Sequence, residues 1–503
     1  MDHLDVAVIG AGFAGIGMGV SLKKAGIEHF KIFEKADRFG GVWRDNTYPA
    51  ACCDVPSHLY SYSFQPYRDP TTRYPGQKAI QGYLEQIVDD QSLRPHLQLS
   101  TAISDARWDH DTGWWALTTA AGAIVAADEV VFAVGMLHRP YIPDFVGRDL
   151  FRGSAFHTAE WDHSQDLAGR NIAIIGTGSS AAQMLPEIAA VARRVDVYQR
   201  TANWVLPKPR TRFGPITRSA FAVFPILHSA YRAAIYLGAD RILGPIMTEG
   251  WSARPMNWIA RQHLRRRVPD PTLRARLTPG YRLGEKRIVV DSRYYTALNL
   301  PNVELITDPI TSIDSDGIIT SDQRRRDVDT IVYATGFRST EFLQPIRITG
   351  RGGMQFHQQW ADGADAYLGV AVRNFPNMWM LHGPNSFITH NSNIAIKESQ
   401  IGLIVRAMLL RRQSGAVAFE IGEHAIAEYR QWLNHAMART IWPTGVNSWY
   451  KAPRAGNSDS RITNPWPASA RAFASYARRD PALTFVPLTA PRASQRARSG
   501  SIG

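Results

Sequence analysis

Two short glycine-rich segments contain the residues whose types and spacing most directly suggest chemistry. Backbone N–H groups at such a turn, followed by the positive end of a helix, bind phosphate oxygens. Each segment therefore predicts a site for a dinucleotide. The candidate phosphate-binding residues are Gly10, Gly12 and Gly15 in the first segment and Gly176, Gly178, Ser179 and Ser180 in the second.

An acidic and a basic residue follow these segments at the same distance. Glu34 lies 24 residues after Gly10, and Arg200 lies 24 residues after Gly176. At this position a carboxylate accepts hydrogen bonds from free ribose hydroxyls, whereas a guanidinium pairs with a 2′-phosphate. For either residue alone a solvated strand end is the better interpretation. The matched spacing with opposite charge favours FAD at the first site and NADPH at the second.

The elements around both segments have the order that a nucleotide-binding unit requires. An apolar strand at 5–9 precedes Gly10 and an Ala/Gly-rich helix follows to residue 26, while a strand at 171–175 precedes Gly176 and a helix follows to about 192. One such glycine motif is weak evidence, because glycines gather at turns of many kinds. Two copies, each between a strand and a helix, predict two Rossmann-like units.

Composition excludes several classes of protein. The chain has 503 residues, 45% hydrophobic and 20% charged, which fits two to four folded domains and excludes a disulfide scaffold or a disordered chain. Its formal charge of +13 is compatible with a nucleic acid or with a polyanionic cofactor. No zinc-ligand spacing, P-loop or GxSxG motif occurs, so we expect no metal site.

The two cysteines, Cys52 and Cys53, are adjacent. Neighbouring cysteines rarely form an unstrained disulfide, and neither C-x-x-C nor C-x4-C spacing occurs, which disfavours a thiol relay. The first residues lack a basic signal-peptide region, and the apolar stretch 219–247 is interrupted by proline and charged residues. We therefore expect a cytoplasmic protein with no transmembrane segment.

The region 208–281 has a different pattern, with helical stretches punctuated by proline and rich in aromatic residues and arginine. It predicts a helical insertion. The run Arg265-Arg266-Arg267 is compatible with anionic lipid or nucleic acid, but such runs are usually solvated helix faces, and we interpret it as one. No groove-reading motif accompanies it, so no nucleic-acid partner is expected.

The linker between the two units carries a specific fingerprint. Phe151, Gly153, His157, Trp161 and Asp162 match F-x-G-x-x-x-H-x-x-x-W-[P/D] in full, just before the second glycine segment. In this feature the sequence resembles the Baeyer–Villiger monooxygenases, the class B flavoprotein family. Ordinary flavin-containing monooxygenases usually lack the Trp and the residue after it. The resemblance implies that His157 ties the linker to a moving nucleotide domain.

Two further segments resemble the same family. Residues 40–54 follow [A/G]-G-x-W-x4-[F/Y]-P-[G/M]-x3-D except at Ala50, which indicates a divergent group, and residues 284–291 resemble its Lys-Arg segment. The resemblance implies that Gly41, Trp43 and Asp54 lie at the flavin. It also implies that Lys286 joins Arg200 and Thr201 at the 2′-phosphate. The implied catalytic residues are Arg287 and its orienting partner Asp54.

The resemblance implies an FAD monooxygenase that uses NADPH and O2 and oxidises an apolar ketone to an ester or lactone through a C4a-peroxyflavin. A fixed guanidinium suits this reaction because a peroxide anion and a tetrahedral alkoxide need a nearby cation. Two alternatives stay open, namely oxygenation of sulfur or nitrogen in a related flavin monooxygenase and, from another class, an FAD-dependent NADPH reductase. Nucleic-acid binding is a distant third, favoured only by charge.

The expected fold is α/β, with two Rossmann-like dinucleotide-binding domains, for FAD and NADP, and a helical insertion in the NADP domain. We assign 1–150 to the first part of the FAD domain and 151–335 to the NADP domain, whose insertion covers about 208–281. Residues 336–487 would complete the FAD domain and supply substrate-facing loops. The basic segment 488–503 is expected to be a flexible tail.

Overall fold

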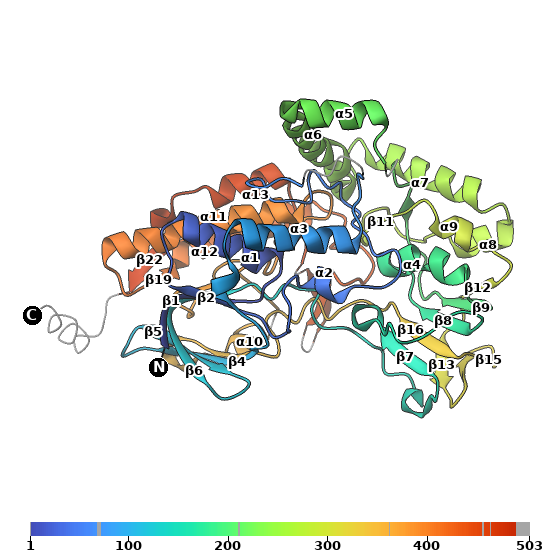
Figure 1. Cartoon of the computed structure of the whole chain (residues 1–503), viewed down its shortest axis with the longest axis horizontal. Helices are drawn as coiled ribbons and strands as arrows, with labels where there is room; N and C mark the ends of the chain where they lie inside the picture. The colour runs from blue at the N-terminus through green and yellow to red at the C-terminus, as the bar shows by residue number, and fades with distance from the viewer. Residues whose placement is uncertain are drawn as a thin grey trace, which may run out of the picture.

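Two sheets flanked by helices form the framework of the molecule, one at the left and one at the lower right of Figure 1. The computed structural model describes residues 2–67, 72–209, 212–361, 363–454, 457–462 and 464–488. The expected tail therefore lies outside the described residues, apart from Leu488.

The first sheet contains the first glycine turn. In the described residues its strand order is β17-β4-β5-β6-β1-β2-β3, and β18 also pairs with β6. β1 pairs in parallel with β2 and β6, so the turn after β1 opens at the carboxyl edge of the sheet. The strands are β1 (Asp2–Ile9), β2 (Phe30–Phe33), β3 (Leu97–Gln98), β4 (Ile103–Asp109), β5 (Trp114–Thr119), β6 (Ile124–Phe132), β17 (Arg347–Thr349) and β18 (Met378–Met380).

Helices from both ends of the chain cover this sheet. α1 packs against α11, so a segment from late in the chain lies beside the first nucleotide-binding helix (Figure 1). The helices are α1 (Phe13–Lys24), α2 (Val42–Asp45), α3 (Gln77–Asp90), α10 (Phe356–Gln359), α11 (Asn393–Ser414), α12 (Glu423–Ala438) and α13 (Ala470–Ala477).

The second sheet contains the second glycine turn and is parallel throughout, with the order β12-β9-β8-β16-β7 in the described residues. Along β8, Ile172 and Ile174 face one apolar cluster while Ala173 and Ile175 face another, as alternation in a strand requires. The elements are β7 (Ser154–His157), β8 (Asn171–Ile175), α4 (Ser179–Ala189), β9 (Arg194–Tyr198), α9 (Tyr294–Ala297), β12 (Val303–Ile306) and β16 (Thr330–Tyr333).

Helices between β10 and β11 make up the insertion. They are α5 (Pro215–Val223), α6 (Pro225–Gly238), a π-helical turn at Ala239–Leu243, α7 (Ala253–Arg267) and α8 (Pro271–Arg276). Short strands complete the fold: β10 (Val205–Leu206) with β11 (Val289–Val290), β13 (Ile310–Ile313) with β14 (Gly317–Thr320) and β15 (Arg325–Asp327), β19 (Ala418–Ile421) with β22 (Phe485–Leu488), and β20 (Lys451–Arg454) with β21 (Asn457–Ile462). The predicted α/β class with two Rossmann-like units and a helical insertion is confirmed.

Within the described ranges, no single helix has both the length and the apolar composition needed to cross a bilayer. One bent pair of segments, Pro215–Phe221 and Ile226–Thr248, meets that requirement by length and composition when the two are taken together across a 109° bend.

Candidate active site

A cavity of about 530 Å³ opens where the first glycine turn faces the second unit. Its walls come from both units and from the late segment that contains α11. Among the residues that line it are Gly10, Gly12, Glu34, Gly41, Trp43, Asp54, Ser179, Gln183, Arg287, His382, Phe387, Asn393, Lys397 and Trp449. Residues far apart in the chain, including several of the candidates, thus share one site.

The two glycine turns have nearly the same backbone geometry. Gly10 has φ +106° and Gly176 has φ +111°, and a Cβ atom would lie 2.7 Å from the carbonyl oxygen of Ala133 in the first and 2.4 Å from that of Ala334 in the second. Any other residue would therefore collide with the neighbouring strand end. Both turns need glycine for the same reason.

Each turn leads into a helix whose first N–H groups are available to an anion. Gly12 and Gly178 are the N-cap residues of α1 and α4, and neither helix has a side chain capping it. Gly15 packs against the first turn, since a Cβ there would lie 1.8 Å from the carbonyl oxygen of Gly10. Gly41 lies against Gly12, since a Cβ atom on Gly41 would lie 3.1 Å from the Cα atom of Gly12. The helix starts fit the phosphates of a dinucleotide.

Glu34 is held in place before any ligand binds. Its side chain is buried, and Oε2 accepts a hydrogen bond from the N–H of Ala11 at 2.9 Å. Oε1 accepts from the N–H of Ala36 at 3.1 Å and from the Arg44 guanidinium at 2.8 Å. The carboxylate therefore lies rigidly beside the first glycine turn, where a ribose would reach it.

Arg200 and Lys286 are brought together, although 86 residues separate them. The pKa of Lys286 is lowered by burial and then by the positive charge of Arg200. Arg200 is exposed, and Thr201 follows it beside the second glycine turn, where its carbonyl accepts from the Thr177 hydroxyl at 3.4 Å. Two cations so close together favour an anionic ligand. None of these three residues lines the main cavity.

Arg287 and Asp54 form an ion pair at the meeting point of the two units. An Arg287 Nη2 atom lies 2.7 Å from Asp54 Oδ2, and the guanidinium lies 5.5 Å from the centre of the Phe387 ring. Burial alone lowers the pKa of Arg287, but the Asp54 carboxylate outweighs that effect, so the pKa is raised. The guanidinium is therefore a permanent positive charge facing the cavity.

Gln183 was not among the sequence candidates, although it joins the two units. It projects from α4 toward the loop that contains Tyr48 and Cys52. Its Oε1 accepts from the Tyr48 hydroxyl at 3.1 Å and from the Cys52 N–H at 3.2 Å, while Nε2 donates to the Cys52 carbonyl at 3.0 Å. Ser180, one turn earlier in α4, also hydrogen-bonds to Tyr48. A lone glutamine within an apolar helix was the available signal.

Lys397 is a second residue that the sequence candidates missed. It lies in the second turn of α11 and lines the cavity, and burial lowers its pKa to about 7. No hydrogen bond or ion pair joins its ammonium group to the part of the chain that the structure describes. A buried amine with no partner in the protein favours an anionic ligand in the cavity. One turn earlier, Asn393 hydrogen-bonds to His382 at 3.2 Å.

The vicinal cysteines are both free. Cys52 lines the cavity with its thiol 3.1 Å from the Lys208 ammonium nitrogen, and burial raises the pKa of Cys53. Neither is arranged as half of a disulfide.

The residues of the linker fingerprint lie at the edge of the second sheet and do not line the cavity. His157 ends β7 beside β16; it is fully buried, and burial lowers its pKa to about 4. Gly153 has no room for a Cβ atom, which would lie 2.5 Å from both the Asp329 carbonyl and the Phe151 ring. Trp161 packs on Phe156, while the half-buried Asp162 accepts from the Ser164 N–H.

The late aromatic segments divide between site and core. Trp449 lines the cavity and packs edge-on against Phe387, with ring centres 5.0 Å apart. Trp466 is fully buried against Trp432 and Phe473 and does not reach the cavity. The ring of Trp466 therefore completes a packed core.

Comparisons with known proteins agree with this geometry. The family model described as pyridine nucleotide-disulphide oxidoreductase matches residues 7–226. The chain is 34% identical over 496 residues to a protein named Baeyer-Villiger monooxygenase from Pseudomonas aeruginosa, covering 98% of this chain and 93% of that protein. It is 36% identical over 487 residues to a protein of the same name from Streptomyces coelicolor, covering 95% and 91%.

Solved structures with the same fold include a cyclohexanone monooxygenase from Rhodococcus sp. Phi1 bound to NADP+. The TM-score is 0.86 at 28% sequence identity, covering 97% of this chain and all of that chain (100%). The similarity therefore extends over both nucleotide-binding units and the segments after them.

Proposed function

The chain belongs to the Baeyer–Villiger monooxygenase family, and on this premise we propose that it uses FAD, NADPH and O2 to insert one oxygen atom beside the carbonyl group of an apolar ketone. The products would be an ester or lactone, NADP+ and water. The ion pair between Arg287 and Asp54 carries this proposal, since it joins the two units at the cavity.

The residues of the first unit fit FAD. The uncapped start of α1 would hold the pyrophosphate, and Glu34 would accept hydrogen bonds from a ribose. Trp43, whose indole N–H donates to the Tyr60 hydroxyl at 3.0 Å, is fixed along the cavity wall where a flat ring would bind. Lys397 would supply the positive charge for an anionic part of the cofactor.

The residues of the second unit fit NADPH. The start of α4 at Gly178 and Ser179 would hold its pyrophosphate, and Arg200, Thr201 and Lys286 would bind the 2′-phosphate. The cyclohexanone monooxygenase to which this chain is similar is bound to NADP+. We accordingly assign 1–150 and 336–487 to an FAD domain and 151–335 to an NADP domain.

Bound FAD would supply the redox chemistry, because it accepts a hydride from NADPH and then activates O2. Arg287 would stabilise the negative charge that develops on oxygen, and Asp54 would orient its guanidinium. Phe387, Trp43 and Trp449 would limit access of water to this charge. A permanently charged guanidinium suits a group that must not take part in proton transfer.

The experiment uses the FAD-loaded enzyme with NADPH and isotopically labelled O2 on a panel of apolar ketones with a matched sulfide. We expect one labelled oxygen atom in an ester or lactone for each NADPH consumed. Labelled sulfoxide without ester would favour heteroatom oxygenation. NADPH oxidation with no labelled product on any substrate would favour a reductase.

A further inference from the structure

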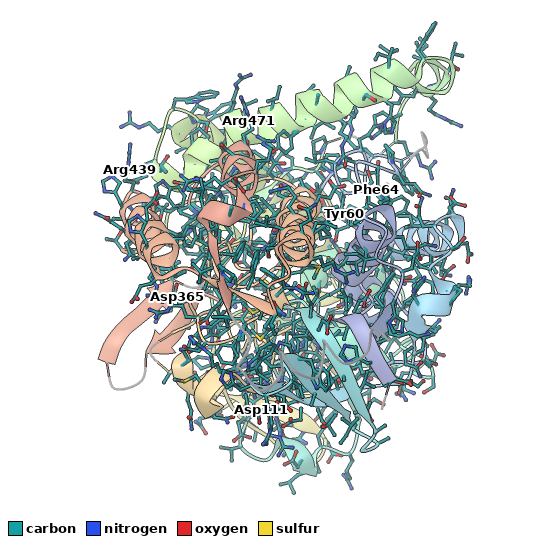
Figure 2. The ribbon with its side chains drawn as sticks, turned by 90° about the vertical axis from the view of Figure 1, so that its left-hand side faces the viewer. Tyr60, Phe64, Asp111, Asp365, Arg439 and Arg471 are labelled. Atoms are coloured by element: carbon teal, nitrogen blue, oxygen red, sulfur yellow. The ribbon has the colours of Figure 1, made fainter. Side chains whose placement is uncertain are left out.

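The helical insertion exposes large apolar side chains on one edge of the molecule. At the corner between α5 and α6, Val223, Phe224, Ile226 and Leu227 are exposed by 66%, 56%, 73% and 41%, and Ile216 on α5 by 87%. In Figure 1, α5 and α6 form the upper edge and α7 lies lower, to their right. In Figure 2, the pale green helices of this part of the chain lie along the top. An apolar cluster of this kind usually marks an interaction surface.

Helix α6 turns polar as well as apolar side chains toward the protein. The polar residues His228 and Arg232 in α6, and Asp240 in the π-helical turn that follows it, face the protein. His228 hydrogen-bonds to the Tyr67 carbonyl at 3.0 Å and Arg232 to the Ser61 hydroxyl at 3.1 Å. Asp240 accepts from Asn391 at 2.8 Å and from the Ala470 N–H at 3.0 Å. The apolar side chains at the start of α6 consequently point outward.

Helix α7 of the same insertion also exposes tryptophan and arginine side chains. Trp251, Arg254, Trp258 and Arg265 are all exposed, and their spacing of three, four and seven residues places them on one face of α7 and the turn before it. No ion pair joins Arg254 or Arg265 to a carboxylate among the described residues. Tryptophan and arginine side by side are typical of a surface that meets lipid head groups.

We propose that the outer face of the insertion, formed by the α5–α6 corner and this face of α7, docks on the surface of an anionic lipid bilayer. The corner would enter the boundary between head groups and acyl chains, and the arginines would pair with lipid phosphates. A second copy of the chain fits less well, because both copies would bring the same unpaired Arg254 and Arg265 to the contact. This inference does not rest on the proposed function.

The structure explains why the insertion stays in place without lipid. Its inner side is fixed by a ring cluster in which His58 stacks on His228, with ring centres 4.1 Å apart, and meets Phe213 and Tyr231 edge-on. Burial lowers the pKa of His58 to about 3, so its imidazole is neutral near pH 7. Docking would therefore engage a preformed face.

The test is co-sedimentation of the full FAD-loaded chain with vesicles of phosphatidylcholine alone or mixed with phosphatidylglycerol. We expect binding to the anionic vesicles only, weakened by high salt. The Phe224→Ser/Ile226→Ser variant should bind at least about tenfold more weakly, since it removes two apolar anchors. Arg254→Gln/Arg265→Gln should lose about fivefold per charge.

Matched controls lie elsewhere on the surface. Val146→Ser/Leu150→Ser replaces side chains exposed by 73% and 67%, and Arg107→Gln/Arg324→Gln removes two exposed charges. Both should bind vesicles like the wild type, and bound flavin should show that every variant is folded. Absence of binding to anionic vesicles would overturn the proposal. So would a wild-type dimer that the corner variant converts to a monomer, which would assign the face to a second copy.

Discussion

The two glycine turns have nearly the same backbone geometry, but the charged residues that follow them, Glu34 and Arg200, have opposite environments. In the first unit, Glu34 is 5% exposed and bound by two backbone N–H groups and Arg44. In the second, Arg200 is exposed, and the described residues give it a neighbouring cation in Lys286 but no carboxylate partner. In the first unit the carboxylate of Glu34 is fixed by protein contacts before a ligand binds. In the second unit the guanidinium of Arg200 has no carboxylate partner in the described residues and is free to pair with a ligand.

This difference in burial suits the first site to a cofactor that stays bound and the second to one that exchanges with solution. A preformed, enclosed site loses little conformational freedom on binding and holds its ligand long. An exposed pair of cations attracts an anion quickly and remains open to solvent and salt. The geometry thus favours FAD that stays bound through many turnovers and NADPH that enters from solution.

Substitution of Arg287, which lies between the two units, should have the largest effect on activity. Arg287→Ala should lower ester or lactone formation by about 10²- to 10³-fold, because it removes the cation that stabilises charge on oxygen. Flavin content and anaerobic reduction by NADPH should be largely retained, as each nucleotide still has its own unit. Product formation in air and reduction without air are measured on one preparation.

Two companion variants sharpen this test. Asp54→Ala should impair oxygenation less, since the cation remains, and Arg287→Lys should restore little, since an ammonium lacks the guanidinium geometry. An Arg287→Ala enzyme that still makes ester at near the wild-type rate would remove Arg287 from the oxygenation step.

Loss of the fixed carboxylate should affect even the empty protein. Glu34→Ala removes the acceptor of the Ala11 and Ala36 N–H groups and one of the two carboxylates that pair with Arg44, which keeps Asp45. This should lower the free energy of unfolding of the apoprotein by about 2 kcal/mol and weaken FAD binding. Chemical denaturation of the apoprotein and FAD titration measure the two effects. As a control, Glu187→Ala breaks an exposed ion pair with Arg293 and should cost at most about 1 kcal/mol.

Loss of the exposed Arg200 should affect nucleotide binding and not the stability of the apoprotein. Arg200→Ala should leave the stability of the apoprotein unchanged but raise the KM for NADPH about ten- to a hundredfold, with little effect on NADH. Steady-state kinetics with both nucleotides provide the measurement, and Arg324→Ala controls for loss of one exposed charge. Equal effects on the two nucleotides would place Arg200 away from the 2′-phosphate.

The smallest expected effect concerns Lys397 and depends on pH. Since burial lowers its pKa to about 7, the ammonium form that attracts an anion is lost as the pH rises above that value. FAD affinity should therefore fall about tenfold between pH 6 and 9. Lys397→Met should bind FAD weakly at every pH and lose this pH dependence. Lys35, an exposed lysine that also lines the cavity, provides the control, and Lys35→Met should retain the pH dependence. A wild-type affinity independent of pH would contradict this role.

Sequence patterns predicted the local part of the fold and site. Gly10, Gly176, Glu34 and Arg200 belong to strand–turn–helix units in which spacing along the chain fixes the position in space. Arg287 and Asp54 are 233 residues apart, so their encounter depends on packing between the units. It was expected only from a resemblance to a known family.

Other residues had local signals that were ambiguous. Lys397 lies in a helix whose apolar neighbours indicate core packing, and nothing nearby in the sequence shows which cavity it meets. In α6 and the π-helical turn after it, the polar residues His228, Arg232 and Asp240 would suit a solvated face. They instead bind Tyr67, Ser61 and Asn391. Periodicity identifies two faces of a helix, and only the tertiary structure decides which one is buried.

Gln183 imitates a β-strand. Its side-chain amide both donates to and accepts from the backbone of Cys52. Residues of two paired β-strands exchange the same pair of hydrogen bonds. A connection of this kind re-forms in only one register. If the two units separate to exchange a nucleotide, the amide would restore their alignment on closing, and the distance between the two cofactors would be reproduced at each turnover.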